Sequence, residues 1–173
     1  MSALDNIPTN KNFLNPLNFT FVLKRSPNLN FFVQSVNIPN FYLTTFEAPS
    51  PTLVVPFGMG HITYQDLQVT FKIDEDFQNY MEVYEWLKAL GQIQTPAEYK
   101  KLQNNPKASG QSLKSDISLI ISDSLKNPNY EITFVDCFPS ALGEVNFQTT
   151  DESVNYVSAS VVFKYTYFDI TKI

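Results

Sequence analysis

The sequence predicts a mainly β (α+β) protein, an antiparallel β-sandwich or split barrel with one flanking α-helix. Residues 67–73 alternate apolar and polar side chains, which is the period of a half-buried strand. Over 77–90 apolar residues recur every three or four positions, which indicates a helix with one apolar face. A second alternation runs over 157–167. The remaining strands follow one another without helices between them, so the sheets should be antiparallel.

The N-terminal region predicts an arm followed by a β-hairpin. Residues 1–16 are polar and contain two prolines, and we expect them to form an N-terminal arm. Apolar residues alternate over 17–24, and a Phe-rich strand is expected over 30–37, beyond the turn signal at 26–28. Because domains most often have about 100–150 residues, 17–173 should form a single β domain.

Residues 38–61 predict an irregular loop, because prolines and glycines interrupt the segment. The segment is nevertheless apolar, whereas loops are usually polar because their backbone faces water. Two interpretations remain open: the segment covers its own sheet, or it contacts a neighbouring subunit. The candidate residues for a subunit or ring interface are Phe41, Tyr42, Phe46, Leu53, Val54, Val55, Phe57 and Met59.

The expected helix begins in an acidic cluster and carries a charged face. Asp74 or Asp76 can cap its N-terminus, and negative charge suits the positive end of the helix dipole. We prefer this structural role of the cluster to metal binding. Trp86 is interpreted as a packing residue, with an interface anchor as the alternative. The candidate outward face of the helix consists of Glu82, Glu85 and Lys88.

The C-terminal half predicts a polar connector over 92–114 and then four strands. These strands are expected near 116–123, 130–137, 144–149 and 154–168, with turn signals between them. The second faces of the long strands carry small, mostly uncharged polar groups, which suit a wet surface. The candidate wet strand face consists of Gln68, Thr70, Asn146, Gln148, Ser158, Ser160 and Thr166.

Composition argues against catalysis and against tight nucleic-acid binding. The 173-residue chain has a net charge of -5, and Arg25 is its only arginine, so no basic stripe is expected. His61 and Cys137 are the only residues of their types, which leaves no metal-ligand spacing and no nucleophile–base pair. We therefore expect no enzyme, no cofactor and no metal. No signal peptide is visible, and no apolar run approaches the ~20 residues of a membrane span.

Four features of the sequence match one family. They are the opening strand LNFTFVLK with a second strand ending in Asn37-Ile38-Pro39, the apolar loop ending at 56–60, the strand–acid–helix block at 63–87, and the closing pattern at 132–170. In this combination the chain resembles the tail tube proteins of contractile-tailed bacteriophages. It is also similar to the tube proteins of contractile injection systems. The arm and the 92–114 segment are less typical of the family in length.

The resemblance implies a structural virion protein of the phage tail, assembled in the host cytoplasm. Copies of the chain would form hexameric rings that stack into a hollow tube, and the strands of each copy would contribute to a shared barrel without open edges. DNA would pass through the lumen without specific binding, because a wall without clustered lysines and arginines does not retain it. The implied partners are the chain itself, the tail sheath and the baseplate, and no membrane.

Alternatives to the repeating tube subunit remain open. A baseplate, tube-initiator or tube-end component of the same fold would share these features, and copy number in the particle would separate it from the tube subunit. A soluble ligand-binding β-sandwich would instead stay monomeric at high concentration.

Overall fold

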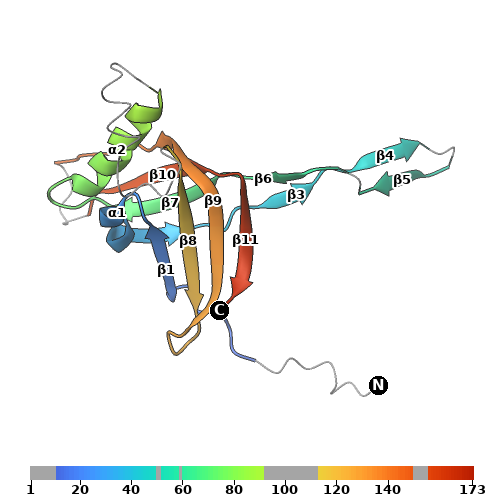
Figure 1. Cartoon of the computed structure of the whole chain (residues 1–173), viewed down its shortest axis with the longest axis horizontal. Helices are drawn as coiled ribbons and strands as arrows, with labels where there is room; N and C mark the ends of the chain where they lie inside the picture. Colours follow the sequence, from blue (N-terminus) through green and yellow to red (C-terminus); the bar gives the residue numbers. More distant parts are fainter. Residues whose placement is uncertain (1–10, 50–51, 59, 92–112, 150–155) are drawn as a thin grey trace.

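The computed structural model describes residues 11–49, 52–58, 60–91, 113–149 and 156–173 (Figure 1). Antiparallel strands dominate it, with α2 on one flank and a long two-stranded projection. The predicted mainly β fold is therefore confirmed. The strands of the body are β1 (Phe19–Leu23), β2 (Val33–Val36), β7 (Leu67–Lys72), β8 (Ser115–Ser122), β9 (Pro128–Leu142), β10 (Ser158–Lys164) and β11 (Tyr167–Lys172).

The body strands form two layers because β9 belongs to both. The first part of β9 pairs with β8 and β11, and its last part pairs with β10. We call the strands β1–β8–β9–β11 layer A and the strands β9–β10–β7–β2 layer B. All of these pairings are antiparallel, and within the described residues neither layer closes into a barrel.

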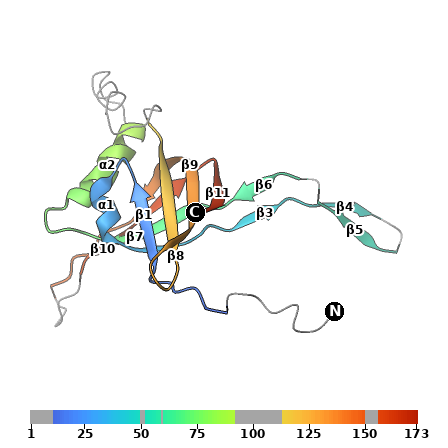
Figure 2. The ribbon, with the colours of Figure 1, turned by 60° about the horizontal axis from the view of Figure 1, so that its bottom comes forward.

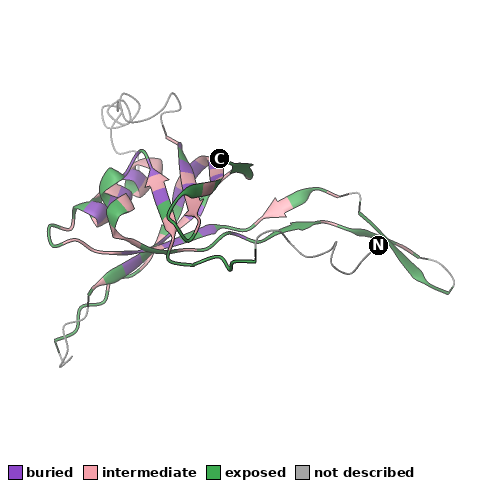
Figure 3. Ribbon diagram, turned by 90° about the horizontal axis from the view of Figure 1, so that it is seen from below, coloured by how far each residue is buried: buried purple, intermediate pink, exposed green. Residues whose placement is uncertain are grey.

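The core lies between the two layers and follows the predicted alternation. Every second residue of β7 is fully buried, namely Leu67, Val69 and Phe71, and Figure 3 shows this region in the colour of buried residues. Burying each large apolar side chain stabilises the fold by about 1.5–3 kcal/mol. The other core residues of the layers are Phe21, Leu23, Ile117, Leu119, Ile132, Phe134, Cys137, Ala159, Val161 and Phe163.

The predicted main helix is confirmed as α2 (Gln78–Gly91). Asp74 caps it: the Asp74 carboxylate accepts the Asn79 N–H at 3.3 Å, and the Asn79 side chain accepts the Asp74 N–H at 3.4 Å. Trp86 is 2% exposed and donates its indole N–H to the Leu113 carbonyl at 2.9 Å. The guanidinium of Arg25 lies 4.8 Å from the centre of the Trp86 ring. Trp86 is thus a packing residue, as predicted.

The predicted N-terminal hairpin is wrong. A short helix, α1 (Pro27–Phe32), replaces the start of the expected second strand, and β1 pairs with β8 while β2 pairs with β7. Pro27 suits the first turn of a helix, where its missing N–H costs no bond. Leu29 is fully buried and fixes α1 against the body. The described part of the arm, residues 11–16, is exposed, and residues 17 and 18 lead from it into β1.

Residues 41–64 form a two-stranded ribbon, so the expectation of an irregular loop over 38–61 is wrong (Figures 1 and 2). The ribbon does not cover its own sheet. Prolines fit because both strands of a ribbon are edge strands, which tolerate a missing N–H. Gly60 is required, because a Cβ there would collide with the Thr44 backbone. The ribbon strands are β3 (Phe41–Leu43), β4 (Phe46–Pro49), β5 (Val54–Phe57) and β6 (Ile62–Tyr64).

The C-terminal strands also differ from the prediction. β9 continues through Pro139 to Leu142 instead of turning there, and no strand is present over 143–149. The expected strand over 154–168 is divided: β10 ends at Lys164, and β11 begins at Tyr167 in the other layer. Most of the predicted connector lies outside the described residues, as do the first ten residues of the arm.

Candidate assembly surfaces

The ribbon presents apolar side chains that no other part of the described chain covers. Phe46 is 59% exposed and Leu53 is 67% exposed, although both are large apolar residues. An isolated two-stranded ribbon is marginally stable in water, and large exposed apolar patches mark interaction sites. Met59 lies outside the described residues. The other candidate interface residues are also exposed: Phe41, Tyr42, Val54, Val55 and Phe57.

An aromatic joint fixes the base of the ribbon to layer A. We give this name to Phe41 and Tyr64 of the ribbon together with Phe134, Tyr165 and Phe168 of the body. The Phe168 ring lies 5.6 Å from Phe41, 5.4 Å from Tyr64 and 5.6 Å from Phe134, measured between ring centres. Edge-to-face and tilted ring pairs at these distances each contribute about 0.5–1.5 kcal/mol beyond burial. The ribbon is therefore oriented before any partner binds.

The hydroxyl of Tyr165 adds a polar contact to the joint. It donates to the Gln65 carbonyl at 2.7 Å, where the chain leaves the ribbon and enters β7. Burial, followed by the charge of Asp66, raises the pKa of Tyr165 to about 12. The hydroxyl thus stays protonated and keeps donating at all physiological pH values. Sequence analysis did not predict this joint, because its rings come from the ribbon, from β9 and from the C-terminal segment, which are far apart in the sequence. The only signal for it was the large number of aromatic residues near the C-terminus.

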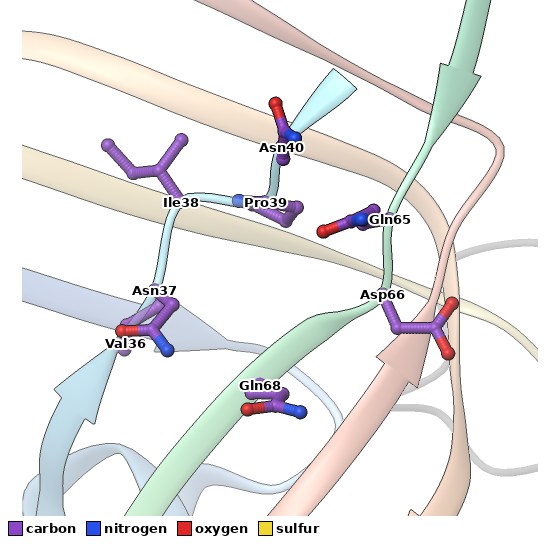
Figure 4. Close-up of a pocket in the computed structure, with 8 residues that line it drawn as sticks. All are labelled: Val36, Asn37, Ile38, Pro39, Asn40, Gln65, Asp66 and Gln68. Atoms are coloured by element: carbon purple, nitrogen blue, oxygen red, sulfur yellow. The ribbon is translucent and has the colours of Figure 1, made fainter. Parts of the chain in front are cut away.

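A hollow of about 910 Å³ opens where the ribbon joins layer B (Figure 4). Four primary amides line it, and Figure 4 shows them around the gap between the two separating strands. Asp66 also lines the hollow and forms an ion pair with Lys164 at 3.2 Å. The lining contains no histidine, cysteine or serine, so it offers no nucleophile–base pair. The amides belong to Asn37, Asn40, Gln65 and Gln68.

Layer B brings part of the candidate wet strand face together. Ser160 lies opposite Thr70, Val162 lies opposite Gln68, and Ser158 extends the same face. The face carries small polar side chains together with Val162, and its two lysines each have a partner: Lys72 lies 4.2 Å from the Tyr156 ring centre, and Lys164 is paired with Asp66. The other three predicted residues are exposed but not in a strand: Asn146 and Gln148 follow β9, and Thr166 lies at the corner between β10 and β11.

The edges of layer A are covered in part by side chains. The Asn30 side chain accepts the N–H of Leu23 at 2.8 Å and donates to its carbonyl at 3.2 Å, as an added strand would. At the opposite edge the carboxylate of Asp169 accepts the N–H of Ile170 at 3.0 Å. Occupied edge groups oppose the addition of another strand. Neither residue could be assigned this role from sequence.

The edges of layer B are more open. Among the described residues, no other strand pairs with the outer side of β2. The opposite edge is the last part of β9, which continues into Gly143. Residues of β2 and of the arm line a hollow of about 310 Å³, and its walls combine polar residues such as Asn15 and Gln34 with apolar residues such as Pro16, Val36 and Ile121.

The charged face of α2 is only partly as predicted. Glu85 and Lys88 are exposed. Glu82 is half-buried, because its carboxylate accepts an N–H from the Asn28 side chain at 2.9 Å and so faces α1. No group of three metal-ligating residues occurs in the part of the chain that the structure describes. Within that part, no helix has the length and apolarity needed to cross a membrane.

Comparison with known proteins identifies relatives in phage tails. No protein-family model matches the sequence. The tail tube terminator protein of Enterobacteria phage T4 is 28% identical over 172 residues, which cover 93% of this chain and 90% of that protein.

Solved structures share the fold over almost the whole chain. A chain of the cap that terminates the tube of the anti-feeding prophage has a TM-score of 0.64 at 15% identity, with 100% of both chains covered. A chain of the baseplate of that prophage has a TM-score of 0.60 at 9% identity, covering 88% of this chain and 90% of that one. The sheath/tube terminator of the PVC extracellular contractile injection system contains a third, with a TM-score of 0.57 at 12% identity, covering 94% and 99%.

The sequence relative, the fold and the exposed assembly surfaces agree with the resemblance found in the sequence. These similarities confirm the predicted resemblance to the bacteriophage tail tube proteins, and the relatives are components of phage tails and of contractile injection systems.

Proposed function

We propose that this chain forms a ring that ends the tail tube. The observation that carries the proposal is the 28% identity to a tail tube terminator over 93% of the chain. A fold match that covers 100% of a chain from a tube-terminating cap supports the same location at the end of the tube. The sequence analysis placed the repeating tube subunit first and the tube-end component second. The comparisons favour the second, because the sequence relative is a tube-end protein.

Ring closure through layer B accounts for its open edges. The strands β9 and β2 lie at opposite edges of the layer and run in opposite directions. A rotation that brings β9 of one copy beside β2 of the next therefore gives an antiparallel pair, and repeated rotation closes a barrel without edges. Six copies are the number we propose, as in the six-fold symmetrised baseplate whose chain shares the fold.

The ribbon is the proposed contact with the end of the tube. It continues the strands β2 and β7, so it points along the strand direction and beyond the ring (Figures 1 and 2). Its paired strands span 41–49 and 54–64, so the shorter one gives the ribbon a reach of roughly 30 Å at about 3.3 Å per residue. Its exposed apolar residues, Phe46 and Phe57 among them, would be buried against the adjoining ring.

The outward face of layer B is the proposed wall of the bore. Ser158, Ser160, Gln68 and Thr70 present hydroxyls and amides there, and the two lysines are held by Tyr156 and Asp66. Such a wall does not bind the phosphate backbone tightly, since that requires unpaired basic groups. DNA would therefore pass without specific binding, and the chain would have no catalytic role.

The proposed partners are the tail tube, the sheath and the baseplate. Chains of the same fold occur in a sheath–tube complex, a sheath/tube terminator and a baseplate. The ribbon is assigned to the tube. Glu85 and Lys88 on the outer face of α2 are the candidates for a sheath contact, because they are exposed and lie away from the core.

An elongation assay tests the proposal. Purified chain is added to tube subunits of the same phage while they polymerise, and tube lengths are measured by negative-stain microscopy. Added chain should stop elongation and appear as one ring at a tube end. Unchanged growth, or incorporation along the whole length, would refute a terminating role.

A variant pair assigns the contact to the ribbon. Phe46→Asp places a charge on the exposed apolar ribbon and should abolish capping. Leu125→Asp is the matched control, because Leu125 is 79% exposed but lies in the β8–β9 turn. Equal capping by the two variants would show that the ribbon is not the contact.

A further inference from the structure

The two chain segments that lead from layer B into the ribbon separate over a short gap. On the side of the body, the Asn37 N–H donates to the Gln68 carbonyl at 3.3 Å. On the side of the ribbon, the Gln65 N–H donates to the Asn40 carbonyl at 2.9 Å. No strand pairing occurs between these two bonds in the described chain. Pro39 lies in the gap, where it is buried and has no N–H to donate. The hollow of about 910 Å³ lies at this gap (Figure 4).

Four amide side chains stand at the ends of the gap as two opposed pairs. The two bonds place Asn37 opposite Gln68 at one end and Asn40 opposite Gln65 at the other. All four residues are exposed, and none of the four side chains forms a hydrogen bond within the described part of the chain. The pairs are separated by three positions in each segment, which is about 10 Å at about 3.3 Å per residue. This spacing matches three residues of an extended polypeptide.

The chemistry of the lining suits a peptide backbone. A primary amide offers two donors and one acceptor, so it complements both the C=O and the N–H of a peptide group. Asp66 also lines the hollow, and its charge is paired with Lys164 at 3.2 Å. Tight binding of a phosphate backbone needs basic groups, and the lining contains none. The hollow therefore favours an uncharged stretch of polypeptide over nucleic acid.

The hollow is accessible from the wet face of layer B. Gln68 belongs to that face and also lines the hollow. Between the amide pairs the wall includes Ile38, which is 51% exposed and can cover an apolar side chain of a bound segment. A polypeptide lying along the wet face would thus meet hydrogen-bonding groups at both ends of the gap and an apolar contact between them.

We propose that this hollow binds an extended stretch of another polypeptide through its backbone. The location of the site rests on the proposed function, because the proposed ring would present the wet face to its bore. The amide pairs would donate to the carbonyls of the bound stretch and accept its N–H groups. Backbone recognition tolerates many sequences, so an uncharged segment of a protein inside the tail would be held where the tube ends.

Fluorescence anisotropy tests the site on the full chain. The probe is fluorescein-labelled Ser-Val-Ser-Val-Ser-amide, which is uncharged at the residues that would enter the hollow. The variant Asn40→Ala/Gln65→Ala should bind it about tenfold more weakly than wild type, because one amide pair loses at least two hydrogen bonds. The matched control is Asn146→Ala/Gln148→Ala, which removes two exposed amides outside the hollow and should bind like wild type. Equal melting temperatures of the two variants would show that the fold is unchanged.

Three results would overturn the site. One is a failure of wild-type protein to bind the peptide at millimolar concentration. Another is equal binding by wild type and the hollow variant. The third is that a labelled DNA duplex binds wild type and loses this binding in the hollow variant, because the ligand would then be nucleic acid. The same peptide with N-methylated valines lacks two backbone donors and should bind at least about fivefold more weakly.

The elongation assay separates this site from the proposed function. Wild-type protein that caps tubes but does not bind the peptide would overturn the site and leave the tube-end role intact. Wild-type protein that binds the peptide through the hollow but does not cap tubes would overturn the tube-end role and leave a peptide site on the chain. The hollow variant should cap tubes normally, because the substituted side chains lie at the base of the ribbon and leave Phe46 and Phe57 unchanged.

Discussion

The aromatic joint gives a quantitative prediction about the ribbon. Phe168→Ala removes the two ring pairs that Phe168 makes with the ribbon, to Phe41 at 5.6 Å and to Tyr64 at 5.4 Å. At about 0.5–1.5 kcal/mol for each pair, release of the ribbon base becomes easier by about 1–3 kcal/mol. Since 1.4 kcal/mol is a factor of ten, the opening equilibrium should increase about 5- to 150-fold.

Hydrogen exchange measures this opening. The exchange rates of the β3 and β6 amides report on opening at the base of the ribbon, and those of the β10 amides report on opening of the body. Exchange can separate the two because local and global opening have different free energies. In Phe168→Ala the β3 and β6 amides should lose protection by the stated factor beyond any loss in β10. Tyr167→Ala is the control, since Tyr167 lies on the opposite face of β11 and is 47% exposed. Unchanged β3 and β6 protection in Phe168→Ala, or the same loss in Tyr167→Ala, would refute the joint.

Three further predictions concern individual side chains. Trp86→Phe should lower the free energy of unfolding by about 1–3 kcal/mol in urea titrations, because the Leu113 carbonyl loses its donor. Gly60→Ala should separate the ribbon strands at Thr44 and abolish tube capping, with a melting temperature of the body close to wild type. Burial raises the pKa of Cys137 from 9.0 to about 12, so the unfolded chain loses this proton first and stability falls as pH rises through that window. Cys137→Ala should show a flatter decline there, and an identical pH profile would contradict the buried thiol.

Local sequence patterns predicted those helices and strands whose structure does not depend on which distant strand they pair with. The alternation at 67–72 and the three-to-four-residue spacing of α2 each reflect one apolar face against one core, so periodicity sufficed. The cap at Asp74 was predictable for the same reason, since its partner is five residues away. The apolar character of the ribbon was also visible, although its strands were not.

Nonlocal pairing explains the failures. Prolines in the ribbon suggested an irregular loop, because only the paired structure shows that these strands have free edges. Pro139 suggested a turn, yet β9 continues through it while passing from layer A to layer B. The strand predicted over 144–149 failed for another reason: the pattern is present, but among the described residues no strand pairs with it. The edge contacts of Asn30 and Asp169 left no signal in the sequence.

The length of the ribbon also has a consequence for assembly. Because it continues β2 and β7, its length would set the distance at which its tip engages another ring in the proposed assembly. Inserting one residue in each strand would advance the tip by about 3.3 Å and exchange its two faces, whereas two residues in each would advance it by about 7 Å and preserve them. The solitary chain would tolerate either insertion. Compatibility between tail components of different phages should therefore depend on matched ribbon lengths as much as on matched side chains.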